Sequence, residues 1–498
     1  MDFSTIFQFY YRLSRQLVYF ALCIGTLAIV VLSVTACQSG PNALPQHPHI
    51  QAYFNYNQAN SYTDPYRQIK RPGDDLEKIL VEQINQAKVS VDVAVQELRL
   101  PNIAKALIDR KAAGVKVRLI LENRYSRGWS EYSTEELAKF NSRESEKYLD
   151  FVKFADRNGD GKLSDAELDQ SDAIRAIKKA NLEWIDDTAD GSKGRGLMHH
   201  KFAIVDRKIV LFGSANFTLS DMHGDFATTG TLGNANNLVK IENQEIANLF
   251  TEEFNLMWGD GPGGKPDSLF GVKKPHRRIA YVLVDNAQIR VKFSPDKQDT
   301  AWEQTSNGLI GTGLAGATKS ADMALFVFST PKLSDVLELR EQTGVKIRVL
   351  VDPQFAYREY SSTLDMWGFV STLDCKSEDG HAWVKPIATV GAPSLATGDL
   401  LHHKFAVIDG NLVITGSHNW SNAANYTNDE TLLVIQNNLV AAHYQREFDR
   451  LYKNATFGPT AKLSQEAPRT CPLNNSKEPA KEPKKQPPTP EELPSPPQ

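Results

Sequence analysis

The stretch His199-His200-Lys201-Phe202-Ala203-Ile204-Val205-Asp206 is followed by a second apolar run and then by Gly213-Ser214-Ala215-Asn216. The same arrangement returns later as His402-His403-Lys404, Asp409 and Gly416-Ser417-His418-Asn419, with every gap identical. Two matches of this length in one register are very unlikely to arise by chance. The chain is therefore predicted to contain two related halves.

Each copy is predicted to form a β-hairpin. Residues 202–205 and 209–212 are short apolar runs on either side of a tight turn at Asp206, and residues 405–408 and 412–414 repeat them around Asp409. Side chains alternate along a strand, so the first His and the Lys of each motif share one face. The second histidines, His200 and His403, point away and are interpreted as structural.

Four kinds of side chain converge from each copy: an imidazole, an ammonium, a hydroxyl and an amide. Lys and Asn can neutralise and orient phosphate oxygens, and His can supply a nucleophile or a proton. The predicted catalytic residues are His199, Lys201, Ser214, Asn216, His402, Lys404, Ser417 and Asn419. Asp206 and Asp409, at the turns, are interpreted as supporting residues that hold the hairpins.

These motifs resemble those of the phospholipase D superfamily, whose signature is His-x-Lys, then Asp, then Gly-Ser-x-Asn. The resemblance covers both halves of the chain outside its two ends. It implies an α/β fold of two α/β/α sandwich halves, related by pseudo-twofold symmetry, with one shared active site. It also implies a phosphohistidine intermediate and no cofactor for the chemistry. His199 is the expected nucleophile and His402 the expected acid/base, although the sequence alone does not order them.

In this superfamily an acidic residue shortly after the Asn orients a catalytic histidine. Glu430 fits that place in the second copy. The first copy departs from the pattern, because ungapped alignment puts Ala227 opposite Glu430 and the nearest acid is Asp225. Either Asp225 substitutes or the first-half acid is missing.

Length and composition are those of a globular chain. The 498 residues give room for two to three domains, with 41% apolar and 23% charged residues. The formal net charge of −4 gives no overall basic field to attract nucleic acid, although a local basic groove stays possible.

The N-terminus has the features of an export signal. Arg12 and Arg15 precede an apolar run from Leu17 to Val34, and small residues precede Cys37. This resembles a bacterial lipoprotein signal over residues 1–36, with Cys37 lipidated and residues 37–50 as a linker. The alternative is an uncleaved membrane anchor. Either way we expect an exported protein of the bacterial cell envelope that is tethered to a membrane, by a lipid in the lipoprotein interpretation.

Two further cysteines, Cys375 and Cys471, would remain after removal of the signal and lipidation of Cys37. They form either a disulfide, in an oxidising compartment, or two free thiols.

The duplication extends beyond the motifs. A strand, a helix and a strand are predicted at 89–95, 102–113 and 115–121, and again at 325–328, 333–342 and 344–351. This β-α-β order predicts a largely parallel sheet with covering helices in each half. The halves are assigned to residues 51–272 and 280–458, followed by a disordered Pro-, Lys- and Glu-rich tail at 464–498.

The first half carries an insertion at about residues 133–180. Within it, the run from Asp156 to Glu167 has the acids and glycine of an EF-hand calcium loop. Its predicted oxygen ligands are Asp156, Asn158, Asp160, the Lys162 carbonyl and Glu167. The alternative is a polar loop without metal.

The leading hypothesis is a membrane-tethered phosphodiesterase, expected as a monomer, that hydrolyses phospholipids. The alternatives are a nuclease of the same superfamily acting on DNA or RNA, and a non-catalytic calcium-responsive binding protein.

Overall fold

The computed structural model describes residues 2, 41–228, 230–376 and 381–471. It divides into two units, Met1–Ala43 with Gln58–Asn60, and Leu44–Asn57 with Ser61–Gln498. The fold and the site described below belong to the second unit. Cys37 and the predicted signal, apart from Asp2, lie outside the described residues. In the part that is described, no helix has the length and apolarity needed to cross a membrane.

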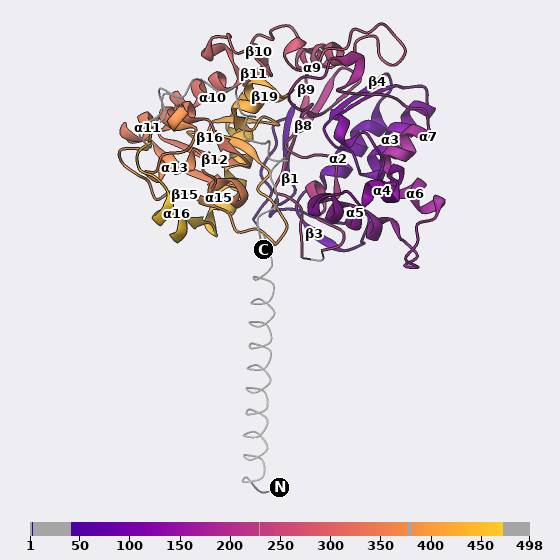
Figure 1. The fold of residues 1–498 in the computed structure, drawn as a ribbon, viewed down its shortest axis with the longest axis horizontal. Coiled ribbons are helices and arrows are strands. Elements are labelled where there is room, and N and C mark those ends of the chain that lie inside the picture. Colours follow the sequence, from indigo (N-terminus) through magenta and orange to yellow (C-terminus); the bar gives the residue numbers. More distant parts are fainter. Residues whose placement is uncertain (1, 3–40, 229, 377–380, 472–498) are drawn as a thin grey trace. The chain divides into compact units, whose positions relative to one another are not determined.

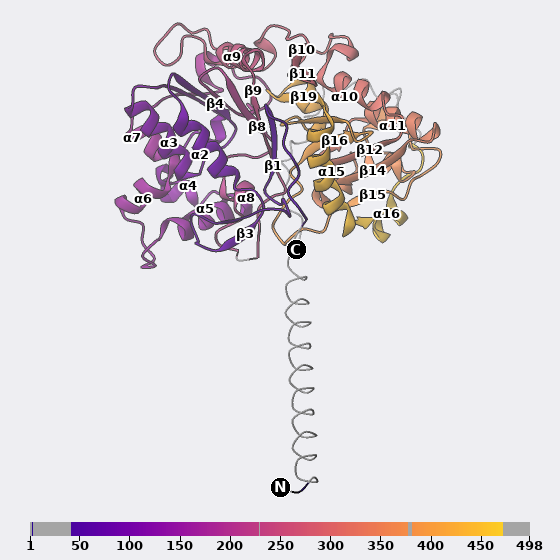
Figure 2. The ribbon, with the colours of Figure 1, turned by 180° about the vertical axis from the view of Figure 1, so that it is seen from behind.

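The first half is built on a seven-stranded sheet (Figure 1; Figure 2 shows it from behind). Its order is β1-β9-β8-β7-β4-β5-β6, with bounds Ile50–Phe54, Asn237–Glu242, Ile209–Gly213, Lys201–Val205, Ser90–Val95, Lys116–Leu121 and Glu183–Asp186. Strands β4, β5 and β6 run parallel, which confirms the β-α-β unit. The other strands pair antiparallel, so the expectation of a largely parallel sheet is wrong. The hairpin at Asp206 reverses the chain, and such a turn joins only antiparallel strands.

The second half repeats this topology in a nine-stranded sheet. Its order is β10-β11-β19-β17-β16-β12-β14-β15-β20, with bounds Ala280–Val284, Ala287–Phe293, Thr431–Gln436, Leu412–Gly416, Lys404–Ile408, Ser320–Leu325, Lys346–Val351, Val390–Ala392 and Thr456–Phe457. The strand expected at 325–328 is displaced, because β12 ends at Leu325. Beyond it, β13 (Phe328–Ser329) pairs instead with β18 (Trp420–Ser421), which follows the second motif.

Helices cover both faces of each sheet. On the outer face of the first half lie α2 (Leu76–Gln86), α3 (Pro101–Ala112) and α7 (Ala173–Lys179), and in the second half α10 (Ser306–Ala315) and α11 (Pro331–Gln342). The opposite faces carry α9 (Gln244–Trp258) and α15 (Asn438–Lys453). Asn243 and Asn437 cap these two long helices by accepting backbone N–H groups with their side chains. Each half is thus an α/β/α sandwich, as predicted.

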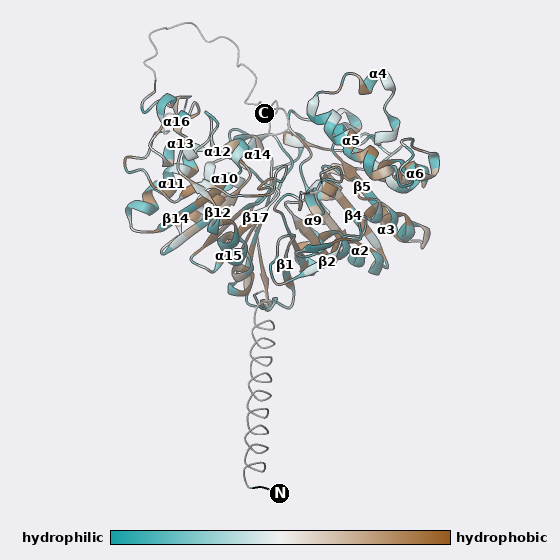
Figure 3. Cartoon of the chain, turned by 90° about the horizontal axis from the view of Figure 1, so that it is seen from below, coloured by the Kyte–Doolittle hydropathy of each residue, from teal (hydrophilic) through white to brown (hydrophobic). Residues whose placement is uncertain are grey.

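Alternation along the strands decides which core each side chain joins. In β7, Ala203 faces the first-half core under α2 and α3, whereas Phe202 and Ile204 face the opposite side. That opposite side is a core shared by both halves, and Phe405 of β16 enters it from the second half. Figure 3 shows the strands largely in hydrophobic brown and much of the outer helix surface in hydrophilic teal. The two halves are therefore joined by a common apolar core.

The turn aspartates hold the hairpins, in line with the sequence interpretation. The carboxylate of Asp206 accepts the backbone N–H groups of Lys88, Val89 and Ser90, which lead into β4. Asp409 does the same for the residues that lead into β12. Both adopt a positive φ, 52° in each case, which Asp tolerates better than most residues. They fix the motif strand to its neighbour and lie at the hairpin turns.

The insertion is helical on both sides of the acidic loop. It contains α4 (Thr134–Leu137), α5 (Ser142–Ala155), α6 (Asp165–Ser171) and α7. The helical segment after the loop is divided at Asp172. This residue ends α6, and its side chain caps α7 by accepting the N–H of Arg175.

Parts of the predicted linker and of the predicted tail have defined structure. His47, in the predicted linker, is buried and bonds Asn286 at 3.1 Å between Nε2 and Oδ1. At the other end α16 (Ala461–Glu466) overlaps the predicted start of the tail, and residues 472–498 lie outside the described residues. Cys375 and Cys471 form a disulfide, with Cα atoms 5.4 Å apart. This bond attaches the end of the described chain to the second half.

The segment between the halves is anchored by a buried ion network. Lys274 is 2% exposed and contacts the carboxylates of Glu253 on α9 and Asp429 before β19. Arg277 contacts the same Glu253 at 3.2 Å. Burial opposes ionisation of Glu253, but Lys274 and Arg277 hold its pKa well below the usual range. Lys274 thus links α9 of the first half to the segment before β19 of the second half, and Arg277 adds a second contact to α9.

Candidate active site

Each motif histidine is positioned by the backbone of the opposite half. The N–H of His199 donates to Asp429 O at 3.0 Å, and the N–H of Asp429 donates to Leu197 O at 2.9 Å. In the same way, the N–H of His402 donates to Ala235 O at 3.1 Å. The chain entering each motif therefore pairs with the segment that enters β19 or β9 of the other half.

His199 pairs with a carboxylate from the second half. Its Nδ1 lies 2.7 Å from Glu430 Oε2, and the same oxygen accepts the hydroxyl of Ser417 at 2.6 Å. Glu430 is fully buried, which raises its pKa, while His418 and Lys201 oppose that shift. The serine of the second motif thus orients the acid that orients the histidine of the first.

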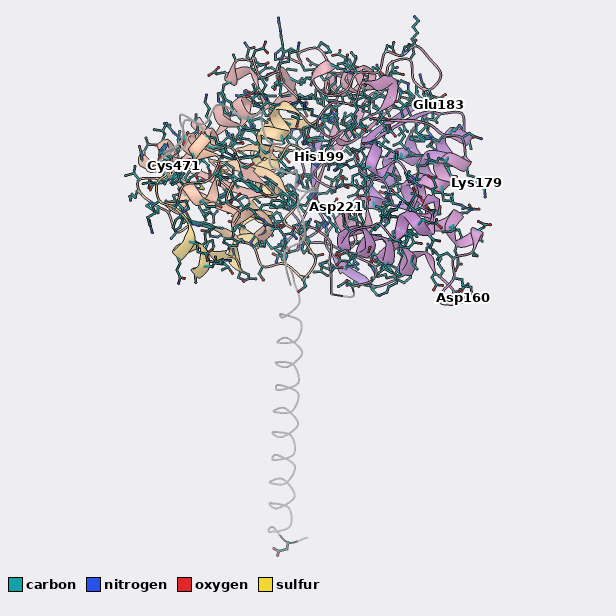
Figure 4. All side chains as sticks on the ribbon, viewed as in Figure 1. Asp160, Lys179, Glu183, His199, Asp221 and Cys471 are labelled. Atoms are coloured by element: carbon teal, nitrogen blue, oxygen red, sulfur yellow. A yellow bond between two sulfur atoms is a disulfide. The ribbon has the colours of Figure 1, made fainter. Side chains whose placement is uncertain are left out.

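His402 pairs with an amide at the equivalent place. Its Nδ1 lies 3.0 Å from Asn236 Oδ1, and that oxygen accepts the hydroxyl of Ser214 at 2.7 Å. The amide nitrogen of Asn236 in turn donates to Asp221 Oδ1 at 3.2 Å. Figure 4 labels Asp221 and His199 where the first-half ribbon meets the second-half ribbon. The amide oxygen of Asn236 therefore takes the place of the carboxylate that holds His199, and Asp221 Oδ1 lies behind it, 3.7 Å from His402 Nδ1.

Of the two alternatives that the sequence left for the first-half acid, the structure favours the second, in which no carboxylate stands at the place equivalent to Glu430. Asp225 accepts the hydroxyl of Ser220, whereas Nδ1 of His402 faces Asn236, and Ala227 is not the counterpart of Glu430. The counterpart is Asn236, 22 residues after Ser214, whereas Glu430 follows Ser417 by only 13. A longer loop separates the two in the first copy, so an ungapped alignment misses the match. The sequence feature that could have identified this match is the apolar strand that directly follows each residue, β9 after Asn236 and β19 after Glu430.

The motif lysines lie beside the histidines. Lys201 Nζ donates to Gln96 Oε1 at 2.8 Å and to the carbonyl of His199 at 3.0 Å. Lys404 Nζ donates to the carbonyl of His402 at 2.7 Å and lies 4.7 Å from the ring centre of Phe326. Both lysines are 1% exposed. They supply positive charge inside the site.

The motif asparagines retain hydrogen-bonding capacity. The Oδ1 atoms of Asn216 and Asn419 are buried and have no hydrogen-bond partner among the described residues. Unpaired buried polar atoms are uncommon in native structures and often mark a place for water or ligand. The two amides are therefore available to a bound group.

The adjacent histidines are structural, as the strand alternation predicted. His200 Nδ1 contacts the hydroxyl of Thr431 at 2.8 Å, and His403 Nε2 contacts Glu447 on α15 at 3.0 Å. Burial lowers the pKa of both imidazoles. His200 thus links the first motif to β19, and His403 links the second motif to α15. Both rings face away from the predicted catalytic residues.

Electrostatics place the two motifs in one site. Burial, followed by the charges of Lys404, Lys201 and His199, holds the pKa of His402 well below its usual range. Two of these charges come from the other half of the chain. Two imidazoles and two ammonium groups therefore act on one another across the halves, and the lysines supply the positive charge that suits a phosphodiester anion.

Comparison with known proteins agrees with this geometry. The family model described as "Cardiolipin synthase, PLD-like domain" matches residues 80–258 and 311–452, well over half of the chain. This chain belongs to that family. It is therefore a member of the phospholipase D superfamily and a phosphodiesterase-type hydrolase or transferase.

The mitochondrial cardiolipin hydrolase of Xenopus laevis is 27% identical over 191 residues, covering 36% of this chain and 79% of that protein. The human protein of the same name is 30% identical over 149 residues, covering 30% of this chain and 50% of that protein. Mitochondrial cardiolipin hydrolases of six further organisms also match. The chain spans only 50% to 58% of the length of these and of the human protein. The phosphatidylserine synthase of Haemophilus influenzae shares the fold, with a TM-score of 0.50 and 12% identity over 84% of this chain and 89% of that one.

The acidic loop of the insertion has the donor atoms that calcium prefers but bonds to its own backbone. Asp156 Oδ2 accepts the N–H of Gly161 at 3.0 Å, and Glu167 Oε2 accepts the N–H of Ser164 at 2.9 Å. Gly159 and Gly161 adopt the positive φ that the tight loop requires. Within the described ranges, no three His, Cys, Asp or Glu side chains are arranged to hold a metal. The predicted ligands are all oxygen donors, as calcium prefers, but their carboxylates bond to the loop backbone and are not gathered as a metal site.

Proposed function

We propose that this member of the phospholipase D superfamily hydrolyses phospholipid phosphodiester bonds at a membrane to which it is tethered. The observation that carries the chemistry is the exchange of partners, in which His199 pairs with Glu430 and His402 with Asn236 across the halves. The lipid substrate is supported by the family description and by relatives named for cardiolipin. The tether is supported by the sequence before and including Cys37.

In the first step, Nε2 of His199 attacks phosphorus. Glu430 holds Nδ1–H, so the lone pair on Nε2 faces the substrate, and its carboxylate balances the positive charge of a phosphorylated imidazole. His402, protonated on Nε2, gives its proton to the oxygen of the departing alcohol. Asn236 holds the other nitrogen of that ring.

In the second step, the now neutral His402 takes a proton from water, and the water oxygen attacks the phosphohistidine. The bond between phosphorus and His199 Nε2 breaks, and a phosphomonoester leaves. An alcohol in place of water would give transfer rather than hydrolysis. The motif lysines and asparagines neutralise and orient the phosphate oxygens in both steps.

A further proposal concerns the insertion. Asp156, Asn158, Asp160, the Lys162 carbonyl and Glu167 would hold one calcium ion, which orders the loop away from the chemistry. No step of the reaction is assigned to this ion.

Parallel incubation of the purified chain with mixed phospholipid vesicles and with single- and double-stranded DNA tests the substrate class. We expect released headgroup or phosphatidic acid and untouched DNA. Cleaved DNA with intact lipid would instead favour the nuclease, and no turnover of either would favour a binding protein.

A further inference from the structure

His418 occupies the variable position of the second Gly-Ser-x-Asn motif, where the first motif has Ala215. Its side chain is 1% exposed. The residues on either side both belong to the site, since Ser417 donates its hydroxyl to Glu430 and Asn419 has a free amide oxygen. The ring therefore stands on the loop that holds the His199–Glu430 pair.

Neither ring nitrogen of His418 has a hydrogen-bond partner among the described residues. The carbonyls of His418 and Asn419 lie near enough to affect its charge, but neither meets the geometry of a hydrogen bond. The other motif-adjacent histidines differ, because His200 and His403 each have a partner for Nδ1. A buried N–H without an acceptor is costly, so a partner is expected when the site is filled.

The ring lies within electrostatic range of the two groups that the proposed mechanism places at phosphorus. Burial lowers the pKa of His418 to about 4, so at neutral pH the imidazole is neutral and carries one N–H donor. The ring interacts electrostatically with Glu430 and His199. The group that comes closest to this pair during the reaction is the phosphate under attack.

We propose that His418 is a substrate-contacting residue that donates a hydrogen bond to a non-bridging phosphate oxygen beside His199. Ala215 cannot make the corresponding contact, so the phosphate is held unequally by the two halves. The inference rests on the proposed function only in requiring a phosphate ester as ligand.

The test measures binding of inorganic phosphate to the full chain by titration calorimetry. His418→Ala removes the donor and copies the first motif, His418→Leu removes it while filling the space, and His418→Asn keeps an N–H donor. Tyr360→Phe is the matched control, because the Tyr360 hydroxyl is also buried without a partner among the described residues but interacts only with Arg358 and Glu359. Thermal melting checks that each variant is folded.

We expect His418→Ala and His418→Leu to weaken phosphate binding at least about tenfold, the loss typical of a hydrogen bond to a charged group. His418→Asn should lose clearly less, and Tyr360→Phe nothing. Affinity within about twofold of the wild type in a folded Leu variant would overturn the proposal. So would equal losses in the Leu and Asn variants, or no phosphate binding by the wild type. Because no lipid is present, failure of lipid hydrolysis leaves this result unaffected.

Discussion

The first histidines of the two motifs, His199 and His402, lie in different surroundings. A carboxylate holds His199, whereas an amide holds His402, and two ammonium groups lie near the second ring. A carboxylate stabilises positive charge on a ring that bonds to phosphorus, and a ring with a low pKa is a strong acid once protonated. The asymmetry supports the assignment of nucleophile and acid that the resemblance implied.

This asymmetry predicts a displaced pH profile. In the free enzyme the pKa of His402 lies below 6.5, so kcat/KM should fall as pH rises through that lowered value. A bound phosphodiester anion favours the imidazolium, so kcat should fall only at a pH higher by about one unit or more. Steady-state kinetics with a soluble short-chain phospholipid measure both. Coincident alkaline limbs would contradict the proposed role of His402.

At the scale of elements, the motif hairpins were readable from sequence because their determinants are local. Apolar alternation defines β7, β8, β16 and β17, and the turn aspartates mark their ends. The partners of the histidines were not all readable. Glu430 lies at a family spacing, but Asn236 follows a longer loop, and its role depends on how β9 meets the second half. Long-range pairing of this kind leaves no local pattern.

The linker between the halves gives a stability prediction. Lys274→Met should lower the free energy of unfolding by about 3–5 kcal/mol, because it leaves Asp429 buried without this cation and Glu253 with Arg277 alone. Lys273→Met is the matched control. Lys273 is exposed, and its Nζ donates to the carbonyl of Gly191, so we expect a change within about 0.5 kcal/mol. Urea unfolding measures both, and equal effects would show that the buried network is unimportant.

The insertion gives a second prediction at this scale. Glu167→Gln should abolish calcium binding and its stabilising effect on thermal unfolding, because the bidentate ligand is lost. Asp165→Asn should bind calcium like the wild type, since Asp165 is outside the ligand set and pairs with Arg175. EDTA should leave turnover largely intact. Turnover that vanishes in EDTA and returns with calcium would mean that the ion acts in catalysis.

At the scale of the whole molecule, the site exists only because two halves share one core. Phe202 and Phe405 enter that core from equivalent strands. The duplication predicted two related halves, the family resemblance implied two sandwiches with one site, and the structure has both halves in that form. Sequence did not predict that the serine of each motif orients the partner of the other histidine. These contacts join residues of different halves, so they exist only when both halves are folded together.

Because each histidine is paired with a residue of the other half of the same chain, we predict that one chain is sufficient for activity. His199→Asn and His402→Asn should each reduce turnover at least about a thousandfold, because the residues act as a unit. A mixture of the two folded variants should be no more active than either alone, since Glu430 and Asn236 serve histidines of their own chain. Activity that recovers on mixing would place the site between chains.

The most direct test is to trap the intermediate. A phosphodiester with a nitrophenyl leaving group needs no proton from His402, so His402→Asn should still form the phosphohistidine but hydrolyse it slowly. After rapid quenching under alkaline conditions, mass spectrometry should find the phosphoryl group on His199 in this variant and no adduct in His199→Asn. An adduct on another residue, or none in the His402 variant despite release of nitrophenol, would contradict a covalent mechanism at one shared site.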